Sequence, residues 1–188
     1  MAIRNIITEG DPFLNKKCRP VEKFDKKLGQ LLDDMAETLR DANGVGLAAI
    51  QVGVLRRIVI IDVGDGEGIR ELINPVLLEQ SGEQEGMEGC LSIPGKWGLT
   101  KRPKHVKVRA QDRHGDFFEY EGDDLLAVAS CHELDHLDGI LFLSHVTHML
   151  TEEELEERAE ADARAKEKAA REARRILEEA QKESSEGK

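Results

Sequence analysis

The chain has few cysteines, no long apolar run and no excess of basic residues, and each absence excludes a class of protein. Three cysteines among 188 residues form an odd, sparse set, which favours reduced thiols in the cytoplasm over a disulfide framework. No apolar run approaches the ~20 residues that a membrane helix needs, and the N-terminal residues lack the apolar stretch of a signal peptide. We therefore expect a cytoplasmic protein with no membrane association.

The charge balance excludes a further class. The net charge is −11. The phosphate backbone of a nucleic acid is also negative, so the chain as a whole is not expected to bind nucleic acid specifically. Hydrophobic residues make up 39% and charged residues 35% of the chain, as in a soluble protein. The length fits one domain with a real core, plus some residues outside it.

Hydrophobic periodicity predicts the elements of that core. Apolar residues recur at helical spacings from Asp25 onward, and Asn43-Gly44 ends this helix. Pro75 places one strand at a sheet edge or at a bend, and residues 112–115 have the composition of a hairpin turn. The predicted strands are residues 57–63, 72–78, 105–110 and 116–120.

Two further helices complete the prediction. One starts at Asp123 or Asp124 as its N-cap and ends at Gly139. The other follows a capping box that begins at Thr151, and it is rich in Ala, Glu, Arg and Lys. The predicted fold is α+β, with mostly antiparallel sheets around the first of these helices. We expect one domain over residues 1–148 and a charged helical extension over residues 149–188.

The first of these helices carries an HExxH motif, His132-Glu133-Leu134-Asp135-His136. Residues four apart lie on one face of a helix, so both imidazoles can reach a single metal ion. Glu133 is then placed to act as a general base toward water. The competing interpretation of the pentad alone is a surface helix with incidental histidines.

A catalytic metal site usually has three protein ligands, and a cysteine is the candidate for the third. Cys131 precedes His132 and points about 100° away around the helix, while Cys18 lies in a polar stretch. Cys90 follows Gly89, which allows close approach of the backbone. We predict Cys90 as the third ligand. One thiolate with two imidazoles suits Fe(II), zinc, nickel or cobalt.

Two other segments suggest a substrate site. Leu125, Val128 and Ala129 share a helix face with His132, which predicts either ordinary core or an apolar pocket for a small or unbranched side chain. Residues 44–51 match a dinucleotide-binding glycine pattern, but a helix precedes them and a strand follows, the reverse of what that site needs. The alternative is a backbone cradle for an extended peptide, with the Gln51 amide stabilising a developing oxyanion.

Three segments together resemble the signature motifs of the peptide deformylase family. They are GVGLAAIQ at residues 44–51, EGCLS at residues 88–92 and HELDHLDG at residues 132–139. Their order and spacing match, and the resemblance covers about residues 3–148. It implies that residues 1–148 are a catalytic domain that hydrolyses the N-formyl group from the formylmethionine of nascent chains and releases formate.

The resemblance also implies roles for individual residues. Cys90, His132 and His136 bind one divalent metal, expected to be Fe(II), with zinc, nickel or cobalt as replacements in purified protein. Glu133 is the acid and base, and Gln51 with the Leu91 backbone N–H holds the formyl oxygen. The backbones of Val45, Gly46 and Gly89 pair with the peptide, and the methionine pocket contains Val45, Leu125, Val128 and Ala129.

Some residues depart from better-known family members. Gly86 stands where a larger aliphatic residue is common at the pocket rim, and Trp97 occupies a variable rim position that contacts substrate. We expect a wider, more apolar rim and a relaxed selectivity. Asp135 is expected to pair with Arg102.

The C-terminal extension has an uneven charge. Residues 151–162 hold seven acids and one base, whereas residues 163–175 hold six bases and two acids, a net of +4. The simplest interpretation is a solvated helix. In some deformylases a C-terminal helix docks on the ribosome, which suggests a similar contact through Arg164, Lys166, Lys168, Arg171, Arg174 and Arg175.

Two other functions compete with a deformylase. A different HExxH metallopeptidase would take His or Glu as its third ligand. A non-catalytic, metal-dependent binding module would not need Glu133 and Gln51, both of which are present.

Overall fold

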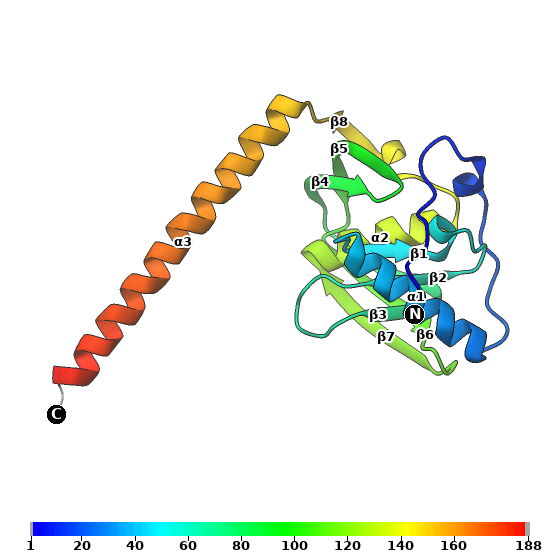
Figure 1. Cartoon of the computed structure of the whole chain (residues 1–188), viewed down its shortest axis with the longest axis horizontal. Coiled ribbons are helices and arrows are strands. Elements are labelled where there is room, and N and C mark those ends of the chain that lie inside the picture. The colour runs from blue at the N-terminus through cyan, green and yellow to red at the C-terminus, as the bar shows by residue number, and fades with distance from the viewer. Residues whose placement is uncertain (1, 187–188) are drawn as a thin grey trace. The chain divides into compact units, whose positions relative to one another are not determined.

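A computed structural model describes residues 2–186 and the side chains up to residue 175. The chain divides into two compact units, residues 1–149 and residues 150–188, which we call the core unit and the C-terminal unit (Figure 1). Among the described residues, no helix is long and apolar enough to cross a membrane.

The first helix of the core unit, α1 (Lys26–Asp41), confirms the prediction from periodicity. The Asp25 side chain caps it by accepting hydrogen bonds from the backbone N–H groups of Lys27 and Leu28. Its apolar face is buried against a core cluster that includes residues of β1 and β2. Asn43 follows the helix with a positive φ of 50°, which accounts for the stop at Asn43-Gly44.

An antiparallel sheet of five strands forms the centre of the core unit, in the order β1-β2-β3-β6-β7. Its strands are β1 (Gly46–Ala48), β2 (Ile58–Ile61), β3 (Arg70–Ser81), β6 (His105–Gln111) and β7 (Phe117–Asp123). The predicted turn between the last two is confirmed. Asp112 stabilises it by accepting from the backbone N–H groups of His114 and Asp116.

Pro75 lies in a strand that has a partner on both sides along only part of its length. β3 pairs with β2 through residues 70–73 and with β6 through residues 73–81. As a whole β3 is therefore not the predicted edge strand, although Pro75 itself lies beyond the pairing with β2. The alternative of a bend is confirmed, because the register of β3 shifts between Ile73 and Val76. This irregularity accommodates the missing N–H of the proline. The side chain of the neighbouring Asn74 forms hydrogen bonds with the backbone N–H and carbonyl groups of Val21.

The helix α2 (Asp124–Leu137) lies against this sheet and contacts β1, β2 and β7 (Figure 1). Its inner face, including Ala129 and Leu137, packs against a buried cluster of sheet residues. Asp123 occupies the N-cap position, but its side chain makes no capping hydrogen bond. Its carboxylate lies 2.9 Å from Nδ1 of His105 instead, so only the position of the cap was predicted correctly.

A second sheet has the order β4-β5-β8. Its strands are β4 (Gln84–Cys90), β5 (Ile93–Arg102) and β8 (Val146–Met149). None of them was predicted, because β4 and β5 are rich in glycine and charge and lack clear alternation. Short 3-10 helices join the elements: η1 (Pro12–Asn15), η2 (Ala49–Val52) and η3 (Phe142–His145).

The C-terminal unit contains one helix, α3 (Glu152–Glu186). The predicted capping box is present, since the Thr151 hydroxyl accepts from the Glu154 N–H and the Glu154 carboxylate accepts from the Thr151 N–H. Ion pairs one turn apart include Glu160–Arg164 and Glu167–Arg171. Of the predicted extension, residues 187 and 188 lie outside the described residues.

The described residues form antiparallel sheets and helices, which confirms the predicted α+β fold class.

Candidate active site

Three potential metal donors from two elements meet in the core unit. Cys90 ends β4, while His132 and His136 lie one turn apart on α2. Their donor atoms all lie within 4.8 Å of one another, and Cys90 Sγ is 3.2 Å from His136 Nε2. The tertiary structure thus brings together the three residues that the motifs suggested as ligands.

The identity of these donors, and the neutral state of one of them, fit a divalent transition metal. Burial, together with the nearby His132, lowers the pKa of His136 to about 3, so its ring is neutral and able to bind a cation. Nδ1 of His132 lies 2.6 Å from Oε1 of Glu88, which directs Nε2 of the same ring away from the carboxylate. Burial by itself would lower the pKa of His132, but hydrogen bonds with Cys90 and Glu88 raise it to about 10, so a metal ion bound there would replace a proton. One cysteine and two histidines form a donor set for Fe(II), zinc, nickel or cobalt.

Glu88 anchors a buried ion network behind His132. Burial by itself would raise the pKa of Glu88, but hydrogen bonds from His132 and Arg102 lower it to about 2. Arg102 donates to both Glu88 oxygens at 2.7 and 2.9 Å, and Thr100 also donates to this carboxylate. Arg102 further donates to Asp135 at 2.7 Å, which confirms the predicted pair.

Glu88 is the residue that sequence reasoning missed. The signal was present: in a strand ending at Cys90, the side chain two positions earlier lies on the same face. A histidine ligand commonly donates its second ring N–H to a carboxylate. Glu88 was missed because strand β4 was not predicted, since its residues show no alternation of apolar and polar side chains.

Glu133 has an unusual environment for a carboxylate. It is buried beside Gly46, where any side chain would collide with the Glu133 carboxylate. Its Oε2 has no hydrogen-bond partner among the described residues. Burial raises the pKa of Glu133 to about 7, although the nearby His132 opposes this shift. A carboxyl group with this pKa can both take up and release a proton near neutral pH.

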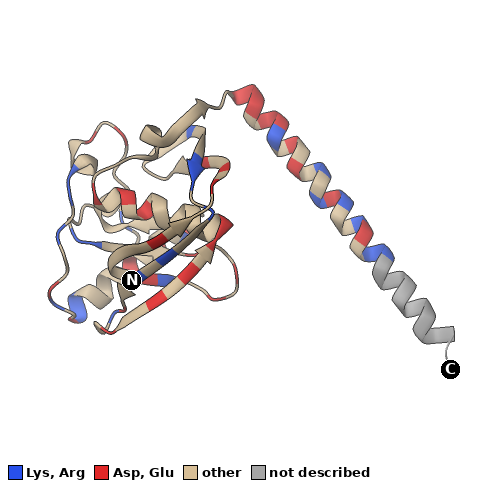
Figure 2. Ribbon diagram, turned by 180° about the vertical axis from the view of Figure 1, so that it is seen from behind, with Lys and Arg blue, Asp and Glu red and all other residues tan. Residues whose placement is uncertain are grey.

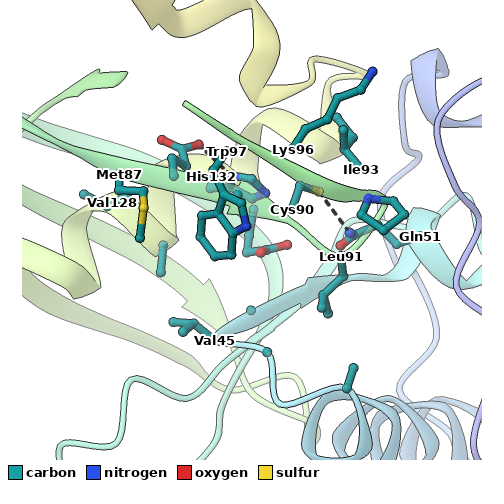
Figure 3. A pocket seen from close by; sticks show the side chains of 18 of the residues that line it. Val45, Gln51, Met87, Cys90, Leu91, Ile93, Lys96, Trp97, Val128 and His132 are labelled. Atoms are coloured by element: carbon teal, nitrogen blue, oxygen red, sulfur yellow. Dashed lines mark hydrogen bonds and ion pairs between the residues drawn. The ribbon is translucent and has the colours of Figure 1, made fainter. Parts of the chain in front are cut away.

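Gln51 reaches the same place from η2. Its Oε1 accepts a hydrogen bond from the Ala48 N–H at 2.8 Å, which fixes the orientation of the amide. The Nε2 group donates to Ser92 Oγ at 3.1 Å and lies 3.6 Å from Cys90 Sγ (Figure 3). The amide N–H groups therefore lie next to the donor cluster.

A pocket of about 400 Å³ opens onto these groups (Figure 3). Glu133 and His132 are among the residues that line it. Gly86 is not among them, and a Cβ atom at Gly86 would meet no other atom within 4 Å. The adjacent Met87 lines the pocket. The remaining predicted site residues in its wall are Val45, Gly46, Gln51, Gly89, Cys90, Leu91, Trp97, Leu125, Val128 and Ala129.

The other two cysteines lie away from the donor cluster. Burial raises the pKa of Cys18 to about 11, and burial raises the pKa of Cys131 to about 11 as well. Cys131 packs with Val106 and Val108 in a small apolar cluster. Both are therefore unreactive core thiols.

Comparison with known proteins gives a consistent match. The family model described as polypeptide deformylase matches residues 3–152. A peptide deformylase of Acetivibrio thermocellus is 55% identical over 166 residues, which cover 88% of this chain and 96% of the relative.

Solved structures agree with this match. A peptide deformylase from Legionella pneumophila is 40% identical with a TM-score of 0.74, covering 89% of this chain and 98% of that one. One from Thermotoga maritima is 38% identical with a TM-score of 0.76, covering 78% and 99%.

Proposed function

Because the chain belongs to the polypeptide deformylase family, it is a metal-dependent hydrolase that removes the N-formyl group from nascent polypeptides, and we propose that Cys90, His132 and His136 hold its metal. The main support is one juxtaposition. Two of the three donors, Cys90 and His132, line one pocket together with Glu133, whose Oε2 has no partner among the described residues, and the donor atom of His136 lies within 4.8 Å of the other two. This family membership leaves no reason to retain the general metallopeptidase alternative.

A divalent cation at these donors would polarise the formyl carbonyl and make water a better nucleophile at neutral pH. We propose Fe(II) as the native ion, as the family resemblance implies, with zinc, nickel or cobalt as replacements during purification. Metal analysis of protein purified without oxygen tests this choice. Cys90→Ala should lose the metal, and full occupancy in that variant would show that the third ligand is wrong.

Gln51 and Leu91 would hold the formyl oxygen. The Gln51 amide is fixed by Ala48 and its Nε2 lies beside Cys90, so it can donate to an oxygen at this position by exchanging its long contact with Cys90 Sγ for the substrate. The Leu91 backbone N–H would supply a second donor. Preorganised donors of this kind stabilise negative charge that develops on a carbonyl oxygen.

Glu133 would move the proton. Its Oε2 accepts a proton from the attacking water, whose oxygen bonds to the formyl carbon. The same carboxyl group then delivers the proton to the leaving nitrogen as the C–N bond breaks, giving a free amine and formic acid, which releases its remaining proton to become formate. The pKa of about 7 that burial gives Glu133 suits both steps.

The peptide would lie between two free strand edges. β1 is the terminal strand of one sheet and β4 the terminal strand of the other, so the backbones of Val45, Gly46 and Gly89 can pair with an extended chain. The methionine side chain would enter the apolar part of the pocket, against Val45, Leu125, Val128 and Ala129.

Release of formate from formyl-Met-Ala-Ser, assayed without oxygen and with added iron, tests this function. Glu133→Ala should keep the metal and lose nearly all turnover, because it removes only the proton carrier. Wild-type turnover in that variant would contradict the mechanism. Metal binding without any formate release by the wild type would instead favour a non-catalytic binding module.

We further propose that residues 1–148 act as the catalytic domain in the cytoplasm and that the extension, residues 149–188, contacts the ribosome. Figure 2 shows acidic residues at the start of α3 and basic residues further along it. The basic segment would face ribosomal RNA, whose backbone attracts it. Its members are Arg164, Lys166, Lys168, Arg171, Arg174 and Arg175.

Co-sedimentation with ribosomes tests this contact. Full-length protein should sediment with ribosomes at low salt, and a chain truncated after Leu150 should not. A variant with the six basic residues replaced by glutamine, which keeps the helix length, separates charge from the helix itself. Equal sedimentation of all three proteins would refute the proposal.

A further inference from the structure

Basic residues without a carboxylate partner gather at one edge of the core unit. Most lysines and arginines of this unit form an ion pair, as Arg70 does with Asp65 at 2.6 Å and Lys101 with Glu83 at 3.0 Å. Six exposed ones have no such pair among the described residues, and Figure 2 shows blue stretches along the edge that most of them occupy. We call them the basic edge: Lys16, Arg19, Lys23, Lys26, Lys27 and Arg56.

The charge of this edge is opposite to that of the unit around it. Residues 16–27 hold six bases and two acids, a net of +4, whereas residues 1–149 hold 18 bases and 25 acids, a net of −7. One of the two acids in the segment, Asp25, uses its carboxylate to cap α1. Salt screens charges more than ~10 Å apart, so a polyanion at this edge would meet the local positive charge and little of the negative charge elsewhere.

The tertiary structure places Arg19 opposite Arg56. The two residues form an isolated parallel β-bridge, and the Arg57 N–H donates to the Arg19 carbonyl at 2.8 Å. Like charges in opposite positions of paired strands destabilise the pairing. No acid relieves this repulsion, because Nη1 of Arg56 donates to the Pro20 carbonyl. The pairing of these two arginines therefore costs stability in the unbound protein.

Lys26 and Lys27 are also in an unfavourable place. They are the first two residues of α1, whose first turn has no acidic residue. The N-terminus of a helix carries a partial positive charge, so lysines there lower the stability of the helix. Local conflicts of this kind are expected at functional sites. A bound polyanion would relieve both conflicts, because it would neutralise the arginine pair and the cations at the start of α1.

The kind of partner follows from what the basic edge lacks. No large hydrophobic side chain among residues 16–27 is exposed. Protein interfaces depend on aromatic and other apolar anchors, and membrane-binding surfaces insert apolar side chains. Lysines and arginines on a surface without such anchors are typical of contacts with the phosphates of a nucleic acid, which fix a protein on the backbone and carry no sequence information.

We propose that the basic edge binds the phosphate backbone of RNA without reading its sequence. The choice of RNA over DNA rests on the proposed function, because a deformylase acts on nascent chains, which are made on particles that contain RNA. The contact is separate from the one proposed for α3, since every residue of the basic edge belongs to the core unit.

Fluorescence anisotropy with a labelled, mixed-sequence, single-stranded RNA tests this proposal. All proteins are full-length and carry glutamine at the six basic residues of α3 proposed to face ribosomal RNA, so that this segment makes no contribution. The edge variant has glutamine at five positions of the basic edge: Lys16, Arg19, Lys23, Lys26 and Lys27. The matched control has the same net charge, with glutamine at five other basic residues of the core unit: Arg40, Lys101, Lys104, Lys107 and Arg109.

With the core unit unchanged, RNA affinity should fall with salt. The slope of log affinity against log salt should be about −3 to −4, as expected for five phosphate contacts on a single strand. The edge variant should bind at least about tenfold more weakly at low salt, with a slope of about −1 or closer to zero. The control should stay within about threefold of the parent and keep its slope.

Formate release from formyl-Met-Ala-Ser checks that each variant is folded. It should be unchanged throughout, because none of the ten substituted core residues lines the pocket. The double variant Lys26→Gln, Lys27→Gln keeps the test meaningful if the edge variant fails to fold, and it should move the slope toward zero by about 1 to 2.

Three outcomes would overturn the inference while leaving deformylation intact. One is equal RNA binding by the edge variant and the control, or no RNA binding by the parent. Another is tighter binding to phosphatidylserine vesicles than to RNA, which would indicate a membrane surface. The third is tighter binding to DNA of the same sequence and length. Absence of formate release in every protein, with RNA binding intact, would be a failure of the proposed function alone.

Discussion

Two arginine–carboxylate pairs of equal length lie in the two units of the chain in opposite surroundings. In the core unit, Arg102 Nη2 is 2.7 Å from Glu88 Oε1, and the two side chains are 5% and 4% exposed. In the C-terminal unit, Arg164 Nη2 is 2.7 Å from Glu160 Oε2, and the side chains are 78% and 69% exposed. Water solvates the second pair whether or not it forms. The first pair has lost its hydration, so either partner alone would be a buried, uncompensated charge.

The comparison shows that distance alone does not determine what an ion pair contributes. The buried pair holds Glu88, and Glu88 holds the ring of His132, so the network couples the stability of the core to the position of a proposed ligand. The exposed pair stabilises only a turn of its own helix. The loss in free energy of unfolding on breaking the buried pair should therefore exceed that on breaking the exposed pair by about an order of magnitude.

Arg102→Ala should have the largest effect. It leaves Glu88 buried without its cation and should lower the free energy of unfolding by about 3–5 kcal/mol. Urea unfolding followed by Trp97 fluorescence measures this change, with Arg164→Ala as the matched control. A loss of about 1 kcal/mol or less, the size expected for an exposed pair, would contradict the comparison.

The pH dependence of stability should reveal Glu88 next. Its pKa is about 2 in the folded protein against an ordinary value of 4.5, so its contribution is present above pH 4.5 and disappears as the pH falls toward 2. The difference corresponds to about 3 kcal/mol. The free energy of unfolding, measured at several pH values across this range with a chelator present, should depend less on pH for Glu88→Gln than for the wild type. The same pH dependence in both proteins would show that Glu88 does not titrate in this way.

Asp135→Asn should have an intermediate effect. Asp135 accepts from Arg102 at 2.7 Å, but its side chain is partly exposed and Arg102 keeps Glu88 as a partner. We expect a loss of about 1–2 kcal/mol in the free energy of unfolding. The same urea titration measures it, and a loss as large as that of Arg102→Ala would mean that Asp135, not Glu88, is the main partner.

Glu160→Gln should have the smallest effect. Removing an exposed pair one turn apart on α3 should cost about 0.3–0.5 kcal/mol of helix stability. Far-UV circular dichroism during heating should show a slightly lower helix content at low salt and no difference at high salt, because salt screens exposed charges. The urea midpoint of the core unit should not move.

Elements with strong local patterns were predicted well. The leucine spacing of α1, the capping box of α3 and the turn at residues 112–115 depend on nearby residues, and all three are present. β4 and β5 were missed because their stability comes from pairing with each other and not from their own composition. The prediction that Pro75 marks an edge strand failed for β3 as a whole because the extent of its pairing with β2 depends on that neighbouring strand and not on residues near the proline.

The sequence by itself determined that His132 and His136 share a helix face, because the helical repeat alone places residues four apart together. It also determined the capping and charge pattern of α3, which involve near neighbours only. The tertiary structure alone decided that Cys90 comes within 3.2 Å of His136, although the two are 46 positions apart. It also decided that Glu88 supports His132, that Gly46 leaves room for Glu133 and that Trp97 rests on Gly89. These contacts join separate elements, so they depend on how the two sheets and α2 pack, which no local pattern specifies.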